Sequence, residues 1–207
     1  MKKEVYTVQS SGLQQKKWKR RLSLAVPILM LLAGIYILSL VFAPKLVPYL
    51  KAGEIKKVVN SSMPEQGNDR LYIPKLGVNA SLKNGGAEVM NDGGTWHRFP
   101  ERGDPLTGGN FIVSAHRWKT GKTPAETIAQ SPFYNTDRLA VGDGIFVDFE
   151  GKRYKYEIFD IFNVEPEQVE IEEPLSIGEK PYMTLYTCTL KGEADGRVVV
   201  RARLVKL

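Results

Sequence analysis

The longest uninterrupted run of apolar residues lies near the N-terminus, from Leu22 to Ala43, and contains no charged side chain. About 20 apolar residues in a helix are enough to cross the hydrocarbon layer of a bilayer. A helix buried in a globular core would show a polar face, and this run has none. A cleaved signal peptide has a shorter apolar region, of about 7–15 residues. The pattern therefore predicts a transmembrane signal anchor over residues 22–43.

Beyond the anchor, residues 44–68 contain three prolines and two glycines and predict a stalk or linker, with helical character near EIKKVVN. From about Asp69 onward polarity alternates with a period near two, as in GDGIFVDFEG, PYMTLYTCTL and GRVVVRARLVKL. Short strands separated by Gly and Asp turns predict an all-β domain over residues 69–207, a closed or nearly closed antiparallel barrel. The best helical candidate follows Ser131–Pro132, where Ser can cap and Pro can occupy the first turn.

The positive charge is concentrated before the anchor. The formal net charge is +6, and residues 1–21 hold seven basic residues against one acidic residue. Removing these from the 29 basic and 23 acidic residues leaves 22 of each, so the rest of the chain has no basic surplus for nucleic-acid phosphates. By the positive-inside rule, residues 1–21 form a cytoplasmic basic tail and everything after Pro44 lies outside the cell.

Cys188 is the only cysteine of the chain. An unpaired thiol outside the cell is buried and inert, paired between chains, or retained for its chemistry. Cys188 stands near the end of the strand YMTLYTC, a placement that suits a nucleophile. A buried structural cysteine is the alternative, since free Cys is among the most buried residue types. Export favours a catalytic role for Cys188, because an unpaired thiol outside the cell is at risk of oxidation unless it serves a purpose.

A catalytic cysteine needs a neighbouring base or positive charge, because the thiolate is the nucleophile. His116 ends the strand GNFIVSA as Cys188 ends its own, so the two can meet at one rim of a sheet. His97 lies between turn signals in GTWHRFP, and its position is less favourable. Zinc ligands would be expected among Cys188, His97 and His116, but these residues lack the spacing of zinc ligands, so no zinc site is predicted.

A developing oxyanion also needs hydrogen-bond donors. Arg197, Arg201 and Arg203 fall on one face of the strand RVVVRARL, so parity alone does not choose among them. Each can equally be a solvated charge on a strand face. Arg197 opens the strand and is the nearest to a rim shared with Cys188.

Several motifs together resemble the sortase family. TLYTC resembles its cysteine signature, SAHR its histidine motif, and Arg197 begins an R-V-V-V strand nine residues after the cysteine. NTDRLAVGDGIFV and LYIPKLGV resemble further blocks of the family, in the same order along residues 70–207. The resemblance implies a closed eight-stranded β-barrel and a membrane-anchored cysteine transpeptidase of the bacterial cell surface.

The resemblance also implies roles for single residues. Cys188 would attack the Thr–Gly carbonyl of an LPxTG-like sorting signal and form a thioacyl enzyme. His116 would protonate the leaving amine and deprotonate the incoming one, and Arg197 would hydrogen-bond the substrate backbone or oxyanion. Thr187 and Ala115 would line the substrate site. The implied partners are surface proteins with C-terminal sorting signals, an acceptor amine from a peptidoglycan precursor or a pilin lysine, and the lipid bilayer.

Some features depart from the family pattern. Ala115 stands where the histidine motif usually has glycine. The stalk sequence offers no convincing lid and there is no second apolar run, so the pilin-polymerising class is not expected. The segment 163–180 is rich in glutamate, which in some sortases helps to hold calcium; a solvated acidic face is the simpler interpretation, and no cofactor or metal is predicted. A thiol hydrolase on the same scaffold and a non-catalytic, membrane-tethered β module are the alternative functions. The glutamates concerned are Glu165, Glu167, Glu170, Glu172 and Glu173.

Overall fold

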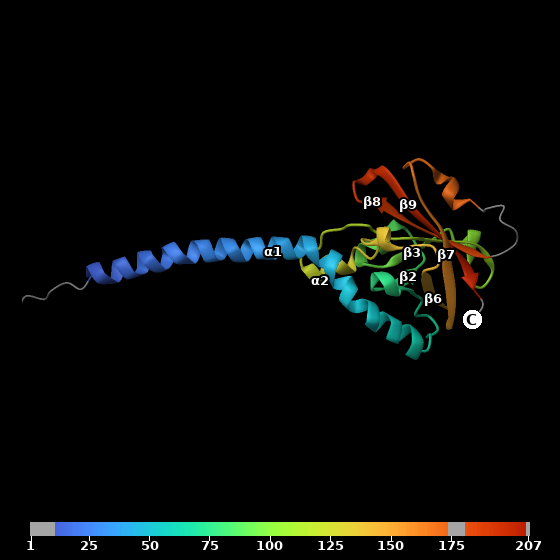
Figure 1. Ribbon diagram of the computed structural model, residues 1–207, viewed down its shortest axis with the longest axis horizontal. Coiled ribbons are helices and arrows are strands. Elements are labelled where there is room, and N and C mark those ends of the chain that lie inside the picture. The colour runs from blue at the N-terminus through green and yellow to red at the C-terminus, as the bar shows by residue number, and fades with distance from the viewer. Residues whose placement is uncertain (1–10, 174–180, 206–207) are drawn as a thin grey trace, which may run out of the picture. The chain divides into compact units, whose positions relative to one another are not determined.

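The computed structural model of the chain describes residues 11–173 and 181–205 (Figure 1). Two compact units divide between Ser39 and Leu40. Helix α1 (Ser11–Ser61) begins in the first unit and ends in the second. Within the described residues, Ser23–Ser61 is the one helical stretch long and apolar enough to cross a membrane, and its most apolar part is not buried. The predicted anchor at residues 22–43 lies inside this continuous helix.

The second unit is built around a closed β-barrel. Eight strands form the ring in the order β3-β2-β1-β6-β7-β9-β8-β5, and a β3–β5 pairing closes it. The short strand β4 pairs with β5 outside this ring. The predicted eight-stranded barrel is confirmed. The strands are β1 (Arg70–Ile73), β2 (Val78–Lys83), β3 (Thr95–Arg98), β4 (Gly103–Asp104), β5 (Gly108–Ser114), β6 (Gly144–Phe149), β7 (Lys152–Val164), β8 (Tyr182–Thr189) and β9 (Gly192–Val205).

Two pairings differ from the expected antiparallel pattern. Strand β2 runs parallel to β3, and β5 runs parallel to β8. The prediction of a wholly antiparallel barrel is therefore wrong at these positions, because the period of polarity in a strand does not reveal the direction of its neighbour. The parallel pair β5–β8 matters for function, since parallel neighbours end at the same edge of the sheet.

The helices of the barrel unit are short. Helix α2 (Pro124–Ala129) precedes Ser131 instead of following it, so the predicted helical position is wrong by several residues. The reason is a stronger start signal at Thr123, whose side-chain oxygen accepts a hydrogen bond from the backbone of Glu126. The remaining helical segments are 3₁₀ turns, namely η1 (Pro74–Leu76), η2 (Ala87–Asp92), η3 (Pro100–Arg102), η4 (Thr136–Arg138) and η5 (Val169–Glu172).

Inward-facing positions of the strands form one hydrophobic core. Leu71, Ile145, Tyr156, Leu185 and Val200 have no solvent exposure and belong to the same buried cluster. They come from β1, β6, β7, β8 and β9, so alternate residues of neighbouring strands fill the interior as expected for a small barrel. The opposite parity on β8 puts Tyr186 and Cys188 on the outer face.

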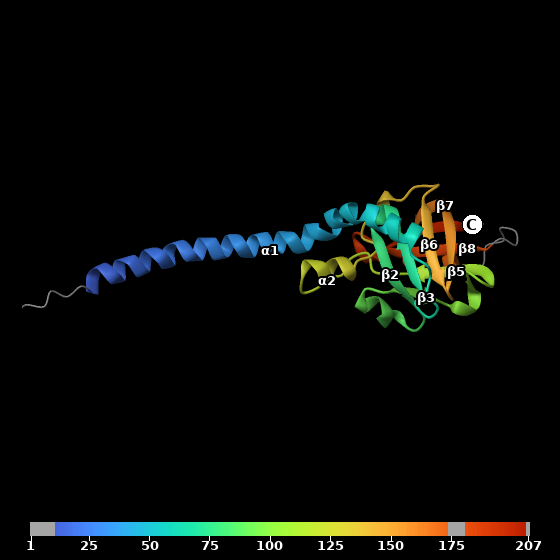
Figure 2. The same ribbon diagram turned by 90° about the horizontal axis from the view of Figure 1, so that it is seen from below.

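The last turns of α1 pack against the outside of this barrel (Figure 2). Ile55 and Val59 are buried against Tyr72 of β1 in a separate apolar cluster. Gly77 adopts a left-handed φ of +65°, and a Cβ there would collide with the backbone of Pro48. The compact unit therefore includes helical residues from Leu40 onward, which takes in the last residues of the predicted anchor and the helical part of the predicted stalk.

Arg153 joins the end of α1 to the barrel by polar contacts. Its guanidinium donates to the backbone carbonyls of Val59 and Ser62. It also forms an ion pair with the buried carboxylate of Asp148 at 2.6 Å, and Asp148 accepts a further hydrogen bond from Tyr72 at 3.1 Å. A cation at the C-terminal carbonyls of a helix is favourable, and the buried carboxylate is fully partnered.

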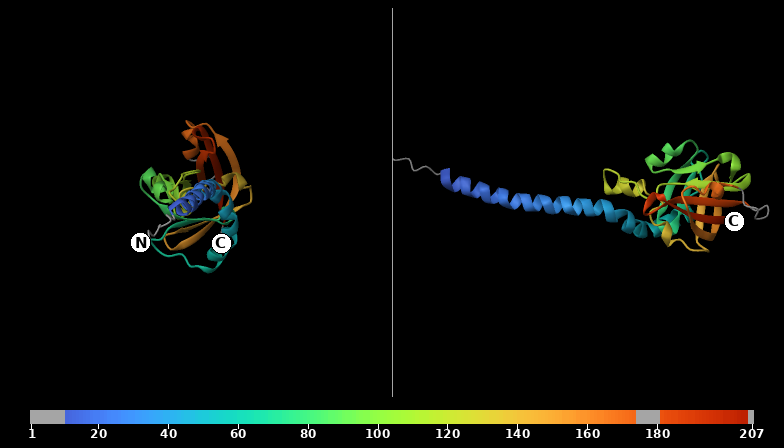
Figure 3. Two further views of the ribbon diagram at one scale, coloured as in Figure 1. Left: turned by 90° about the vertical axis from the view of Figure 1, so that its left-hand side faces the viewer. Right: turned by 90° about the horizontal axis from the view of Figure 1, so that it is seen from above.

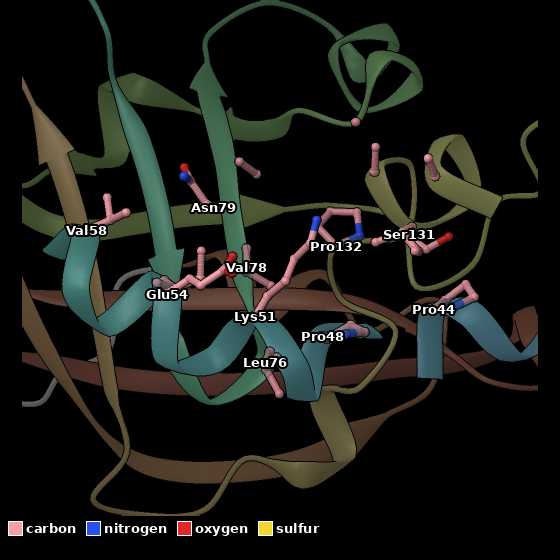
Figure 4. Close-up of a pocket in the computed structure, with 17 residues that line it drawn as sticks. Pro44, Pro48, Lys51, Glu54, Val58, Leu76, Val78, Asn79, Ser131 and Pro132 are labelled. Atoms are coloured by element: carbon pink, nitrogen blue, oxygen red, sulfur yellow. The ribbon is translucent and has the colours of Figure 1, made fainter. Parts of the chain in front are cut away.

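A cavity of about 420 Å³ lies between this helical segment, β2 and α2 (Figure 4). Pro48 and Lys51 line it from α1, Val78 from β2, and Ala129 from α2. Cys188 and His116 are not among the residues that line it. This cavity belongs to the packing of the helix on the barrel and lies apart from the candidate active site.

Candidate active site

Cys188 and His116 lie at the same rim of the barrel. Parallel strands β5 and β8 pair Ser114 with Tyr186. His116 and Cys188 each follow this pair by two residues: His116 lies just beyond the end of β5, and Cys188 is the last residue but one of β8. Adjacent strands lie about 4.8 Å apart, so the two residues lie at the same end of neighbouring strands. Both residues are partly buried, which leaves access for a substrate.

The two strand ends are joined by a buried hydrogen bond. The hydroxyl of Thr187 donates to the carbonyl of Ala115 at 2.8 Å, and the two residues are 1% and 3% exposed. Each of these residues immediately precedes a candidate catalytic side chain. The sequence predicts that Thr187 and Ala115 line the substrate site. The structure brings them together but buries both, so their direct contact is with each other.

Burial shifts the protonation of both candidate catalytic groups. It raises the pKa of the Cys188 thiol above its ordinary 9.0, with Arg197 acting in the opposite direction and Glu193 raising the pKa further. Burial lowers the pKa of His116 below 6.5; Lys119 lowers it further, whereas Glu193 raises it. At neutral pH these shifts leave Cys188 as a thiol and His116 as a neutral imidazole. An imidazole in this form can accept the thiol proton.

Register separates the three arginines that parity could not distinguish. Arg197 pairs directly with Cys188 across β8 and β9, the red strands in Figures 1 and 3. Its guanidinium donates to the carbonyl oxygens of Glu193 at 2.6 Å and Gly196 at 3.1 Å. The side chain is thus held against the first residues of β9, at the end of the hairpin that carries the thiol.

The other two arginines lie progressively farther from Cys188. Arg201 pairs with Thr184, and its guanidinium lies 4.9 Å from the centre of the Phe162 ring. Arg203 pairs with Tyr182 at the far end of β8 and forms a 2.7 Å ion pair with Glu157. Both therefore have contacts of their own away from the thiol.

His97 occupies a different environment from His116. It is 1% exposed inside the barrel and packs edge-on against Phe111 at a centroid distance of 4.8 Å. Its Nε2 is 3.0 Å from the carbonyl of Gly103 and carries the proton, because a carbonyl only accepts. Burial lowers its pKa. His97 is a packing residue, and the structure separates it from the rim that holds Cys188.

Three polar neighbours of the rim carry no recognisable sequence signal. The Oδ1 atom of Asn91 lies 3.4 Å from Nε2 of His116 and accepts a hydrogen bond from Lys119 at 2.6 Å. Glu193 contributes to the electrostatics of both His116 and Cys188. Asn91 lies in η2, Lys119 in a loop and Glu193 near the start of β9, so only the folded chain brings them to the site.

The acidic segment after β7 is not uniformly solvated. Glu172 is buried, and its carboxylate lies 3.1 Å from Arg98 and accepts a 2.7 Å hydrogen bond from the hydroxyl of Tyr186. The amide of Asn110 donates to the carbonyl of the same glutamate at 3.2 Å. The expectation of a solvated face is wrong for Glu172, because partners on β3, β5 and β8 compensate its burial. These contacts fasten η5 to the outer face of the strand that leads to Cys188.

The rest of the segment agrees with the simpler interpretation or lies outside the described residues. Glu165, Glu167, Glu170 and Glu173 are exposed, and residues 174–180 are not described. Within residues 11–173 and 181–205, no three His, Cys, Asp or Glu side chains gather so that they could hold a metal ion.

A family model for the sortase domain matches residues 71–205, and the chain therefore belongs to the sortase family. The family predicted from the motifs is confirmed. Membership supports a transpeptidase function in general terms. No curated protein sequence matches the chain.

Solved sortase structures share the fold. Sortase E1 from Streptomyces coelicolor, with a tripeptide in its active site, is 28% identical with a TM-score of 0.54 over 68% of this chain and 89% of that chain. A sortase D5 transpeptidase from Clostridium perfringens is 26% identical with a TM-score of 0.54 over 74% and 88%. A lid mutant of sortase A from Corynebacterium diphtheriae is 23% identical with a TM-score of 0.57 over 72% and 75%. The similarity extends over several sortase classes and does not select one.

Proposed function

We propose that this sortase cleaves an LPxTG-like sorting signal between Thr and Gly and transfers the upstream protein to an amine at the cell surface. The observation that carries the proposal is the parallel register of β5 and β8, which puts His116 and Cys188 at one rim, with Arg197 opposite the thiol on β9. A peptide occupies the active site of the Streptomyces coelicolor relative, which supports a peptide substrate here.

In the first half-reaction, the Cys188 proton passes to His116 and the sulfur attacks the Thr carbonyl carbon. The Arg197 guanidinium, a fixed donor pairing with Cys188 in register, stabilises the oxyanion that develops. Collapse of the tetrahedral intermediate breaks the Thr–Gly bond, and the imidazolium returns its proton to the leaving amine. The product is a thioacyl enzyme with a neutral His116.

In the second half-reaction, an acceptor amine attacks the thioester carbonyl. His116 removes a proton from the amine, and the Cys188 sulfur leaves as a thiolate that recovers this proton. The result is a new amide bond, and the resting thiol and imidazole are restored. Water in place of the amine would give hydrolysis on the same scaffold, so the acceptor alone distinguishes transpeptidase from hydrolase.

The membrane topology is part of the proposal. The basic residues of the tail at 1–21 favour a cytoplasmic N-terminus, and the apolar stretch within α1 is long enough to cross the bilayer. This orientation puts the barrel outside the cell, where exported proteins with sorting signals and surface amines are available.

The test is mass spectrometry of the full chain in detergent, incubated with an LPxTG-type peptide library with and without an amine acceptor. A ligated product joined at Thr, dependent on the amine and lost in Cys188→Ala, is expected. Cleavage that ignores the amine would instead support the hydrolase. A folded protein with an inert thiol and no thioacyl adduct would support the non-catalytic module.

A further inference from the structure

A second cavity, of about 580 Å³, lies between the last turns of α1 and the barrel surface formed by β6 and β7. We call it the Arg138 pocket. Cys188, His116 and Arg197 are not among the residues that line it, so it is separate from the candidate active site. Its charged lining residues are Lys56, Lys75, Arg138, Asp143, Lys155 and Glu157.

The acidic residues of this pocket are already paired. Asp143 forms a 2.7 Å ion pair with Lys75, and Glu157 forms one of 2.7 Å with Arg203. Within the described residues, no carboxylate lies at ion-pair distance from the other lining cations, Lys56, Arg138 and Lys155. Three of the positive charges that line the cavity therefore have no ion-pair partner within the described parts of the chain.

Arg138 supplies the most specific feature. Its guanidinium lies over the Tyr49 ring, 3.2 Å from the ring centre, which orients the planar group. Its Nη1 atom is buried and has no hydrogen-bond partner. Protein atoms cover Nη1, whereas the other two guanidinium nitrogens are not covered in this way, so they remain available to an oxygen of a ligand in the pocket. The planar fork of arginine matches phosphate oxygens especially well.

We propose that the Arg138 pocket binds the phosphate group of a ligand. A phospholipid headgroup is the favoured source, because the lining turns of α1 continue the helix that carries the apolar run. Ala43 and Ala52 are nine residues apart, which is about 14 Å of helix. Lys45, Lys51 and Lys57 are exposed on the same part of the helix and add to the attraction for an anionic surface.

The test uses the full chain in zwitterionic detergent and follows its thermal unfolding midpoint. Short-chain phosphatidylglycerol, short-chain phosphatidylcholine and inorganic phosphate are titrated separately. Phosphatidylglycerol is expected to raise the midpoint saturably, since a ligand that binds only the folded state stabilises it. Arg138→Gln should weaken the apparent affinity by about tenfold or more, as loss of a charged hydrogen bond does.

Matched variants keep the proposal falsifiable. Lys155→Gln also lines the pocket and should weaken binding even if Arg138→Gln fails to fold. Lys152→Gln, an exposed lysine at the start of the same strand that does not line the pocket, should bind as the wild type does. Cys188→Ala should also bind normally, which separates this result from the catalytic proposal.

The separate titrations distinguish a phospholipid headgroup from a soluble phosphate compound as the ligand. A response to phosphatidylglycerol alone supports the headgroup, and an equal response to inorganic phosphate supports a soluble phosphate ligand. No saturable shift with either anion would overturn the proposal. The proposal would also be overturned if phosphatidylglycerol raised the unfolding midpoint of Lys155→Gln as much as that of the wild type. An equal rise of the wild-type midpoint with phosphatidylcholine would overturn it too.

Discussion

The rim around Cys188 and the helix-packed face around Arg153 are held in place in different ways. At the rim, backbone register aligns Cys188 with Arg197, and one buried hydrogen bond, from Thr187 to Ala115, ties the two strand ends. Cys188 itself is only partly buried. Few side-chain contacts hold the candidate catalytic residues, so their positions depend mainly on the pairing of the strands.

On the helix-packed face, side chains make the connection. Ile55 and Val59 are buried against Tyr72, and Arg153 links the buried Asp148 to the carbonyls that end α1. Here apolar burial and a satisfied ion pair join segments far apart in sequence. The comparison shows that register aligns the candidate active site, whereas side-chain packing holds the helix on the barrel.

The largest effect should come from the rim. Cys188→Ala should lower the rate of thioacyl formation by about 10³-fold or more, because the proposed nucleophile is lost. His116→Gln should lower kcat/KM by about 10²–10⁴-fold, because the proposed general base is lost. Rates are measured by mass spectrometry of the peptide products, with circular dichroism of each variant alongside. His97→Gln, inside the barrel, is the histidine control. If this variant folded normally and lost as much kcat/KM as His116→Gln, the proposed role of His116 as general base would be wrong.

The helix-packed face should respond in stability instead. Ile55→Ala should lower the free energy of unfolding by about 2–4 kcal/mol, since it empties a buried site. Leu50→Ala, on the same helix but 80% exposed, should change it by about 0.5 kcal/mol or less. Denaturant unfolding in detergent measures both. Equal effects of the two variants would mean that this part of α1 is a stalk and does not pack on the barrel.

A smaller effect separates two threonines on β8. Thr187→Val should cost about 1–3 kcal/mol, because the buried carbonyl of Ala115 loses its donor. Thr184→Val should be neutral or stabilising, since the buried Thr184 hydroxyl has no hydrogen-bond partner. Thermal unfolding of the pair gives the comparison. Thr187→Val should also lower kcat if the hydrogen bond aligns the rim, and an unchanged kcat would limit its role to stability.

The pH profile should show the smallest changes. The profile of kcat/KM should fall on the acid side as His116 protonates, below pH 6.5, and on the alkaline side as Cys188 ionises, above pH 9.0. Lys119 lowers the pKa of His116, so Lys119→Met should move the acid limb to higher pH. Glu193 raises both pKa values, so Glu193→Gln should move both limbs to lower pH. A shift of the alkaline limb alone in Lys119→Met would contradict these electrostatics.

Local patterns in the sequence predicted several features well. The charge-free run at 22–43 predicted the apolar helix, and period-two alternation predicted the β domain. Both patterns depend only on the surroundings of a single helix or strand, and not on which other segments pack against it. The position of Cys188 and His116 at strand ends suggested a shared rim. Arg197 remained one of three candidates, since residues two apart share a strand face wherever the thiol lies.

Non-local contacts decided the remaining features. The parallel pairing of β5 with β8 brings His116 and Cys188 to one end of the two strands, and the antiparallel register of β9 puts Arg197 opposite Cys188. The sequence predicts a solvated charge at Glu172, yet this residue is buried, with Arg98 and Tyr186 as its partners. Alternation along a strand specifies which face a residue takes, whereas neighbours, register and partnered burial depend on which strands meet, and that is a property of the folded barrel.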